Sequence, residues 1–249
     1  MTAIRALVFD VDGTLAETED LHRQSFNQAF AEHGLDWNWD CSLYTELLAT
    51  TGGRERIEAY AARTGQPVDA AALHARKTQL YNLKIQQRGV SLRPGVENLI
   101  GHARRQGLAL AIGTTTSRPN VASLLEATLG PEAWDLFASI RTGEDVRTKK
   151  PDPEVYRLVL SDLGLEGREC LCIEDSRNGL MAARAVGMRV IVTPSLFTSH
   201  EDFSGADLIL RNLALPWSSP EFEPLTTWTS QPLDVFSLLT GSQSEAGGT

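Results

Sequence analysis

The chain has 249 residues, of which 42% are hydrophobic and 22% charged, so it is long enough to bury a full core without disulfides or zinc. Its formal net charge of −9 argues against nucleic acid as the main partner, because proteins bind phosphate backbones through clustered lysine and arginine. No apolar run approaches the roughly 18 residues of a membrane helix, no cleavable signal shape opens the chain, and three cysteines fit a reducing compartment. We therefore expect a cytoplasmic protein that binds neither membrane nor nucleic acid, although a local positive pocket would still accept a small anion.

The first predicted element is a buried strand at residues 4–9, which ends in the tight turn D-V-D-G-T at residues 10–14. After this turn the apolar residues Leu21, Phe26 and Phe30 recur at helical spacing. Further helices are expected near 40–48, 54–63 and 69–87. Because no strand is expected between residues 17 and 92, this stretch is predicted to form an all-helical unit of its own.

From residue 94 onward, predicted helices and strands alternate. The helices are expected at 96–105, 120–129, 153–163 and 178–186, and the strands at 108–112, 139–141, 170–173, 189–192 and 207–210. Alternation implies a parallel sheet covered on both faces, so the fold class is α/β, a doubly wound parallel sheet with the helical unit inserted after the first strand. We expect a core of residues 1–16 and 93–215, a helical cap of 17–92, and a partly disordered C-terminal extension of 216–249.

Ligands of open parallel sheets bind beyond the carboxyl ends of the strands. Two polar clusters from the first half of the chain are expected at this edge of the sheet. Asp10 and Asp12 follow the first strand and can converge on one point, although Asp-Gly turns are also common without any function. Residues 114–117, all Thr or Ser, follow the strand at 108–112 and can grip phosphate oxygens. Ordinary capping of the next helix explains the second cluster equally simply.

Two further clusters follow in the second half of the chain. Lys150 precedes a predicted helix and can neutralise a phosphate or an aspartate, while the alternative is a solvated charge. Glu174 and Asp175 end the strand at 170–173 and suit Mg²⁺, while the alternative is a helix cap by Asp175 or Ser176. Each cluster is weak alone, but their order, and the position of each at the carboxyl end of a predicted strand or just before a helix, predict one site.

This set resembles the haloacid-dehalogenase-type phosphotransferases, which are Rossmann-like enzymes. The first motif of that family, D-x-D-G-T, matches residues 10–14, and its other motifs match Thr114, Lys150 and the pair Glu174-Asp175. The helical insertion lies where the family carries its C1-type cap. The resemblance covers nearly the whole chain to about residue 210.

A closer resemblance lies in the cap, where residues 15–23 and 50–57, with 114–120 of the core, are similar to the CbbY-type sugar-bisphosphate phosphatases. That group is close to the β-phosphoglucomutases. The resemblance implies a Calvin-cycle hydrolase that converts xylulose 1,5-bisphosphate to xylulose 5-phosphate and phosphate. Arg54 stands where close relatives carry Lys, so the positive charge is kept with a different donor geometry.

The family resemblance also implies the catalytic roles. Asp10 is the expected nucleophile, which forms an aspartyl-phosphate. Asp12 is the expected general acid and then base, and we expect burial and an acidic neighbour to favour its protonated form. Lys150 would neutralise the nucleophile, and Thr114 would bind the transferring phosphoryl group. Mg²⁺ is the expected cofactor, held by Asp10, the Asp12 backbone carbonyl and Asp175, with Glu174 in or near its shell.

A second set of residues is expected to bind the sugar and its other phosphate. Simpler interpretations stay open for four of these residues. His22 can belong to the core of the cap, and Glu17 can be a surface acid at the hinge. His74 and Lys77 can lie on a solvated helix face. The expected set is Glu17, His22, Thr51, Gly52, Gly53, Arg54, Arg56, His74, Lys77, Thr115, Thr116, Ser117, Arg118 and Asn120.

Three rival functions remain possible at this point. A mutase would use the same core motifs and return the phosphoryl group to the sugar. A binding protein on a degenerate fold should have lost a nucleophile, the Lys or the metal acids, and all of these are present. A dehalogenase on the same scaffold fits less well, because Asp12 and the paired acids favour Mg²⁺ and phosphate. We therefore expect a Mg²⁺-dependent phosphatase that acts as a monomer on a small phosphorylated sugar.

Overall fold

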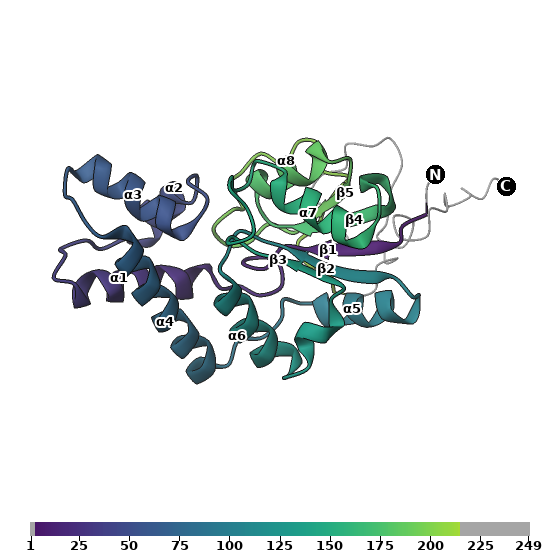
Figure 1. The fold of residues 1–249 in the computed structure, drawn as a ribbon, viewed down its shortest axis with the longest axis horizontal. Helices are drawn as coiled ribbons and strands as arrows, with labels where there is room; N and C mark the ends of the chain where they lie inside the picture. The colour runs from purple at the N-terminus through teal and green to yellow at the C-terminus, as the bar shows by residue number, and fades with distance from the viewer. Residues whose placement is uncertain (1–2, 215–249) are drawn as a thin grey trace.

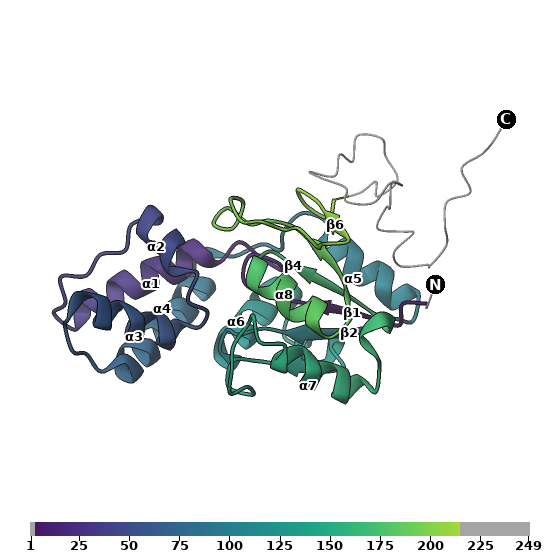
Figure 2. The same cartoon turned by 90° about the horizontal axis from the view of Figure 1, so that it is seen from above.

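The computed structural model describes residues 3–214 of the chain. A sheet with helices on both faces forms the larger part, and four helices in the first third of the chain form a separate group at one end (Figures 1 and 2). The C-terminal extension expected at 216–249 lies outside the described residues. No helix within residues 3–214 has the length and apolar character needed to cross a membrane.

Six parallel strands form the sheet in the order β3-β2-β1-β4-β5-β6. They are β1 (Ala6–Phe9), β2 (Ala109–Gly113), β3 (Ser139–Arg141), β4 (Cys170–Glu174), β5 (Arg189–Val192) and β6 (Leu208–Ile209). Strand β1 is central, with Phe9 opposite Ile112 on one side and Ile173 on the other. Asp10, the next residue, therefore lies between the carboxyl ends of β2 and β4.

Helices cover both faces of this sheet, as the alternating sequence predicted. The helices of the body are α5 (Val96–Arg105), α6 (Arg118–Leu129), α7 (Glu154–Leu163) and α8 (Arg177–Ala185), with short 3₁₀ turns at Ala133–Leu136 and Gly167–Glu169. Leu7 and Phe9 of β1 pack in one apolar core with α5 and α6, whereas Ala6 and Val8 pack in the other with α7 and α8. This alternation is the expected consequence of side chains pointing to opposite faces along a strand.

The remaining helices are α1 (Glu19–Glu32), α2 (Cys41–Leu47), α3 (Gly53–Thr64) and α4 (Ala70–Arg88), and they form the cap. They enclose a core of their own, in which Phe26, Phe30 and Trp39 are fully buried. The chain enters and leaves the cap through two adjacent segments, since the Arg93 backbone N–H donates to the Leu15 carbonyl at 2.8 Å. The cap therefore joins the body at a double-stranded hinge, with α4 beside α6 (Figure 1).

The structure confirms the predicted fold class. Most ends of the predicted helices and strands lie within two residues of the observed ends. The strand expected at 4–9 begins at Ala6, and the strand expected at 207–210 shrinks to Leu208–Ile209. Helix α6 begins at Arg118 and not at residue 120, because Pro119 fits the first turn of a helix, where no backbone N–H is needed.

Candidate active site

A cavity of about 380 Å³ lies between the body and the cap. Seventeen of the twenty residues predicted for the site line it, and the exceptions are Glu17, Arg118 and Glu174. Asp10 and Thr114 follow the ends of β1 and β2, Lys150 lies in the turn before α7, and His22 and Lys77 come from cap helices. The topology therefore brings together residues that are far apart in the chain, such as Asp10 and Lys150, which are separated by 140 positions.

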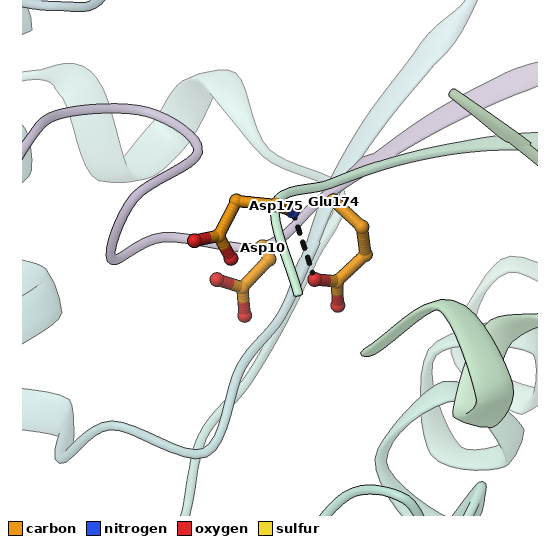
Figure 3. Close-up of side chains that lie close together, drawn as sticks. All are labelled: Asp10, Glu174 and Asp175. Carbon is orange, nitrogen blue, oxygen red and sulfur yellow. Dashed lines mark hydrogen bonds between the residues drawn. The ribbon is translucent and has the colours of Figure 1, made fainter. Parts of the chain in front are cut away.

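Three carboxylates gather on the body side of this cavity. Asp10, Glu174 and Asp175 each offer an oxygen, and these oxygens all lie within 4.8 Å of one another. Figure 3 shows the carboxylates of Asp10 and Asp175 side by side, with the Asp175 backbone N–H donating to Glu174 at 3.2 Å. Gly13 permits this approach, because a Cβ there would lie 2.2 Å from Asp175 Oδ2. Hard cations such as Mg²⁺ prefer ligands of this kind.

Burial makes the negative charges of this cluster unfavourable, because little positive charge lies nearby to balance them. Burial, aided by the neighbouring carboxylates, raises the pKa of Asp10 to about 7 against the opposing effect of Lys150. Burial and the charges of Asp10 and Glu174 also raise the pKa of Asp175 well above its usual range. A divalent cation would relieve both costs, so the residues present fit a magnesium site.

Lys150 reaches into the cluster from the turn before α7. Its buried Nζ donates to Asp10 Oδ1 at 2.6 Å, to Glu174 Oε1 at 2.7 Å and to the Gly113 carbonyl at 2.8 Å. Burial opposes its charge, but the two carboxylates outweigh that effect and raise the pKa of Lys150. Glu174 also accepts a hydrogen bond from the Tyr156 hydroxyl and is fully buried. It therefore does not line the cavity, and its contacts fix Lys150 beside Asp10.

Asp12 lies in a different environment, two residues beyond Asp10. Its Oδ1 accepts hydrogen bonds from the Thr18 hydroxyl at 2.6 Å and from His22 Nε2 at 2.9 Å. Burial opposes the charged form, but His22, the Thr18 hydroxyl and the charge of Lys77 together lower the pKa of Asp12. The expectation that burial and an acidic neighbour keep Asp12 protonated is therefore wrong, because these cap residues stabilise the carboxylate.

His22 connects Asp12 to Lys77. Lys77 Nζ lies 2.6 Å from His22 Nδ1, and the imidazole stacks on the Tyr81 ring at 4.0 Å between centroids. With Lys77 protonated, Nδ1 accepts its hydrogen bond, so Nε2 carries the proton that is donated to Asp12. Burial lowers the pKa of Lys77 to about 7, which makes it a proton reservoir near neutral pH. Neither residue is on a solvated face.

Hydroxyl groups line the next part of the wall, after β2. The Thr116 backbone N–H donates to Thr114 Oγ1 at 3.2 Å, and Asn120 Nδ2 donates to Thr116 Oγ1 at 3.1 Å. Within residues 3–214, Ser117 Oγ and Asn120 Oδ1 are buried without a hydrogen-bond partner. Arg118 points elsewhere, since its guanidinium pairs with Asp145 at 3.4 Å and covers the Trp134 ring.

The cap side of the cavity is rich in cationic groups around the start of α3. Gly52 has a φ of 98°, and a Cβ at Gly53 would lie 2.8 Å from the His74 ring, so the two glycines let this loop approach His74. Burial and then the charges of Lys77 and Lys149 lower the pKa of His74 to about 4. Positive groups from cap and body therefore converge on this part of the cavity.

Two residues predicted to bind the substrate, Arg56 and Glu17, make hydrogen bonds or ion pairs with other residues of the protein. Arg56 is buried and donates to the carbonyls of Leu47 and Thr50 and to the Tyr44 hydroxyl, although it still borders the cavity. Glu17 lies at the hinge and faces a second cavity, of about 520 Å³, where it pairs with Arg93 at 2.9 Å. The structure therefore places Glu17 away from the cluster of Asp10.

Sequence reasoning missed several residues of the site, three of which make contacts where the cap meets the body. Thr18 precedes α1 and resembles a helix cap, yet its side chain makes no capping hydrogen bond and binds Asp12 instead. Lys149 lines the cavity 3.7 Å from Glu55 of the cap, and Asn178 donates to Thr51 across the same boundary at 3.0 Å. The signal for Lys149 was its position next to Lys150, whereas nothing in the sequence marked Asn178.

Comparisons with known proteins identify the family of this chain. Residues 4–187 match the family model of the haloacid dehalogenase-like hydrolases. The chain is 50% identical to the protein CbbY of Rhodobacter capsulatus over 214 residues, which cover 85% of this chain and 94% of that protein. It is 48% identical to the plasmid-encoded CbbY of Cupriavidus necator over 223 residues, which cover 86% and 87%.

Solved structures give the same relationship. A D10N mutant of CbbY from Rhodobacter sphaeroides, in complex with xylulose-1,5-bisphosphate, has a TM-score of 0.82 at 46% identity and covers 85% of this chain and 95% of that one. A β-phosphoglucomutase from Clostridium difficile has a TM-score of 0.72 over 84% and 92%, but at 19% identity it shows the fold alone. The chain therefore belongs to the haloacid dehalogenase-like hydrolases and, within them, to the CbbY group of phosphatases.

Proposed function

We propose that this enzyme is a Mg²⁺-dependent phosphatase that converts xylulose 1,5-bisphosphate to xylulose 5-phosphate and phosphate through an aspartyl-phosphate on Asp10. One observation carries the proposal. Two aspartates on a single turn have opposite environments, Asp10 beside Lys150 and two further acids, and Asp12 beside Thr18 and His22. Such a division lets one carboxylate attack phosphorus while the other moves protons.

Asp10 supplies the nucleophile in the first step. Its carboxylate oxygen forms a bond to phosphorus as the bond from phosphorus to the sugar oxygen breaks. Lys150 favours the ionised form of Asp10 and orients it, and Thr114, which is 2% exposed at the end of β2, would hydrogen-bond the phosphoryl oxygens. Asp10, the Asp12 backbone carbonyl and Asp175 would hold Mg²⁺. The bound cation would offset the negative charge of these groups and of the phosphate.

Asp12 handles the protons of both steps. The leaving sugar oxygen takes a proton from Asp12, and this proton is supplied from Lys77 through the ring of His22. In the second step Asp12 accepts a proton from the water that attacks phosphorus, which releases phosphate and regenerates Asp10. The lowered pKa of Asp12 keeps it ionised, and so able to accept a proton, in the second step, and the buried chain to Lys77 provides the route for its reprotonation.

The cap side supports a substrate with a second phosphate. Arg54, Lys77 and Lys149 line the cavity in a chain of net charge −9, so the cavity offers a dianion three cationic groups. The CbbY structure with a bound bisphosphate sugar supports the same substrate class. We place the reaction in the Calvin cycle and in the cytoplasm, with a core of 1–16 and 93–215 and a cap of 17–92. We expect the enzyme to be a monomer, which gel filtration tests.

The decisive test combines substrate turnover with the Asp10→Asn variant. Purified enzyme with Mg²⁺ and xylulose 1,5-bisphosphate should release phosphate and xylulose 5-phosphate, followed by phosphorus NMR. Asp10→Asn should abolish release while its circular dichroism spectrum stays that of wild type, because an amide cannot form the acyl phosphate. Asp135→Asn, on the surface away from the cavity, is the matched control. Activity of Asp10→Asn near that of wild type would sink the assignment, and an isomeric sugar phosphate without free phosphate would indicate a mutase.

A further inference from the structure

The loop between β5 and β6 contacts the expected metal site on one side. The Thr198 hydroxyl donates to the Asp175 carbonyl at 2.7 Å and lies 3.3 Å from its carboxylate Oδ2. The Ser195 backbone N–H donates to the same hydroxyl at 2.9 Å. Thr198 and Ser195 are both buried, so Asp175 is held from behind by a fixed hydroxyl group.

The same loop contacts the cap through the residue before Thr198. Phe197 is 6% exposed and belongs to the aromatic core of the cap, where its ring meets Tyr44 edge-on at 5.6 Å and 87°. The Tyr44 hydroxyl in turn donates to Glu19, which lines the main cavity. In Figures 1 and 2 this loop, drawn in yellow-green, extends from the body toward α2.

Other contacts hold the first residues of the loop in place. The guanidinium of Arg93, at the hinge, donates to the carbonyls of Thr193 at 2.7 Å and Pro194 at 2.9 Å. The backbone at the start of the loop is therefore tied to the hinge. A movement of the cap relative to Phe197 must then be taken up at residues 195–198, which include the hydroxyls that face Asp175.

We propose that Phe197 is a positioning residue, which couples the docking of the cap to the orientation of the Asp175 carboxylate through its neighbour Thr198. This inference rests on the proposed metal site at Asp10 and Asp175. Coupling of this kind is reciprocal, so a cation that binds better in the docked arrangement favours docking by the same factor. Cap closure and cation binding then support each other, although the cap contributes no ligand to the cation. A purely structural Phe197 would fill an apolar gap in the cap and leave cation affinity unchanged.

Isothermal titration of the substrate-free enzyme with MgCl₂ tests the coupling without reference to turnover. Thr198→Val should weaken the Mg²⁺ dissociation constant about tenfold, as is typical for groups that hold a metal ligand, whereas Thr198→Ser keeps the hydroxyl and should bind as wild type does. Phe197→Ala should weaken it about three- to tenfold, although Phe197 touches no ligand. Leu196→Ala, on the same loop but 78% exposed, is the matched control and should leave the constant unchanged.

A double variant separates coupling from general damage. If Phe197 acts through Thr198, Phe197→Ala combined with Thr198→Val should bind Mg²⁺ no more weakly than Thr198→Val alone. A wild-type dissociation constant in Phe197→Ala, or full additivity in the double variant, would overturn the coupling. Should Phe197→Ala fail to fold, Phe197→Leu replaces it, with an expected loss of at least twofold, and wild-type affinity there has the same meaning. Absence of Mg²⁺ binding by the wild type would contradict the metal site itself, a result distinct from failure of the coupling.

Discussion

Two side chains of the same type acquire different chemistry here because of what surrounds each of them. Burial and then the charges of Glu174 and Asp12 raise the pKa of Asp10, and Lys150 opposes them. Asp12 is backed by Thr18, His22 and Lys77, which are all cap-side groups that stabilise its charge. The cap thus contributes to the protonation state of a core residue, which the D-x-D-G-T motif alone does not reveal.

The depressed pKa of Lys77 predicts a distinct dependence of stability on pH. The unfolded lysine titrates near 10.5 and the folded one near 7, so between these values the unfolded state binds more protons and stability rises with pH. Relative to Lys77→Met, wild type should gain about 2 kcal/mol in the free energy of unfolding between pH 7 and 9. Urea unfolding of both proteins at several pH values measures this difference. A difference that stays constant with pH would show that Lys77 keeps its ordinary pKa.

Arg54 and Lys77 should differ in their effect on substrate choice. Arg54 is more than half exposed at the cavity rim, and its partner Glu58 lies on the same helix. Arg54→Ala should therefore lower the specificity constant for the bisphosphate about tenfold. The specificity constant for an aryl phosphate, which has no second phosphate, should stay unchanged. Lys77→Ala should harm both substrates, because Lys77 acts on Asp12 through His22. Arg63→Ala, which removes an equally exposed ion pair of α3, is the control. Equal losses on both substrates for Arg54→Ala would mean that Arg54 only positions the cap.

At the scale of elements, the sheet edge explains why the site forms where it does. β1 and β4 run in parallel and in register, so Asp10 and Glu174 leave the sheet side by side. Helix α8 then starts at Arg177, after Ser176, whose side chain accepts a capping hydrogen bond from the Gly179 backbone N–H, and α8 packs directly against the Glu174 carboxylate. The first turn of α8 therefore sets the position of Glu174, and through it that of Lys150.

This packing makes Gly179 intolerant of a side chain. A Cβ at Gly179 would lie 1.9 Å from the Glu174 carboxyl carbon, so Gly179→Ala should displace Glu174 and Lys150 and destabilise the fold by about 1–3 kcal/mol. Turnover should fall with it. Gly101→Ala, in α5, meets only the flexible end of Arg105 at 3.4 Å and should stabilise by about 0.5–1 kcal/mol. Thermal melting of both variants checks the contrast, and a wild-type melting temperature with full activity in Gly179→Ala would contradict this account of α8.

The order of helices and strands could be predicted because the spacing of apolar residues differs between the strands of the body and the helices of the cap. Strands buried on both faces read as short apolar runs, and the cap reads as a long stretch without them. The strand ends then located Asp10, Thr114 and Asp175 of the body, and the start of a helix located Lys150. Residues whose role depends on packing between distant segments escaped, because Thr18, Lys149 and Asn178 have ordinary local sequences and gain their contacts only when the cap meets the body.

At the scale of the whole molecule, the distribution of charge explains why a cap is needed. The chain carries a net charge of −9, and the body places three carboxylates at the point where an anionic substrate must react. Positive charge comes from Lys150 in the body and from residues that the cap brings over the cavity. In the proposed mechanism, substrate, cation and cap therefore have to assemble together before the carboxylates and the phosphate can be neighbours.

The uncompensated negative charge of the cluster of Asp10, Glu174 and Asp175 leads to a prediction about the stability of the whole molecule. Because burial and repulsion raise the pKa of Asp175, a cation that binds only the folded state should stabilise the protein. At a Mg²⁺ concentration about one hundred times its dissociation constant the gain is about 2.7 kcal/mol, or a rise of roughly 5–10 °C in melting temperature. Asp175→Asn should abolish this rise, while its melting temperature without cation should not fall, because one of three repelling charges is gone.

Calcium separates binding from catalysis in the same experiment. Ca²⁺ should also raise the melting temperature, because it binds carboxylates, but it should inhibit turnover, since it takes more ligands at longer distances and so misplaces Asp10 for in-line attack. Differential scanning fluorimetry and phosphate release, run on the same samples with Mg²⁺, Ca²⁺ or excess chelator, measure both effects. Asp135→Asn should respond to both cations as wild type does. Full activity in excess chelator, or an equal Mg²⁺ shift in Asp175→Asn, would mean that the carboxylates of β1 and β4 do not hold the cation.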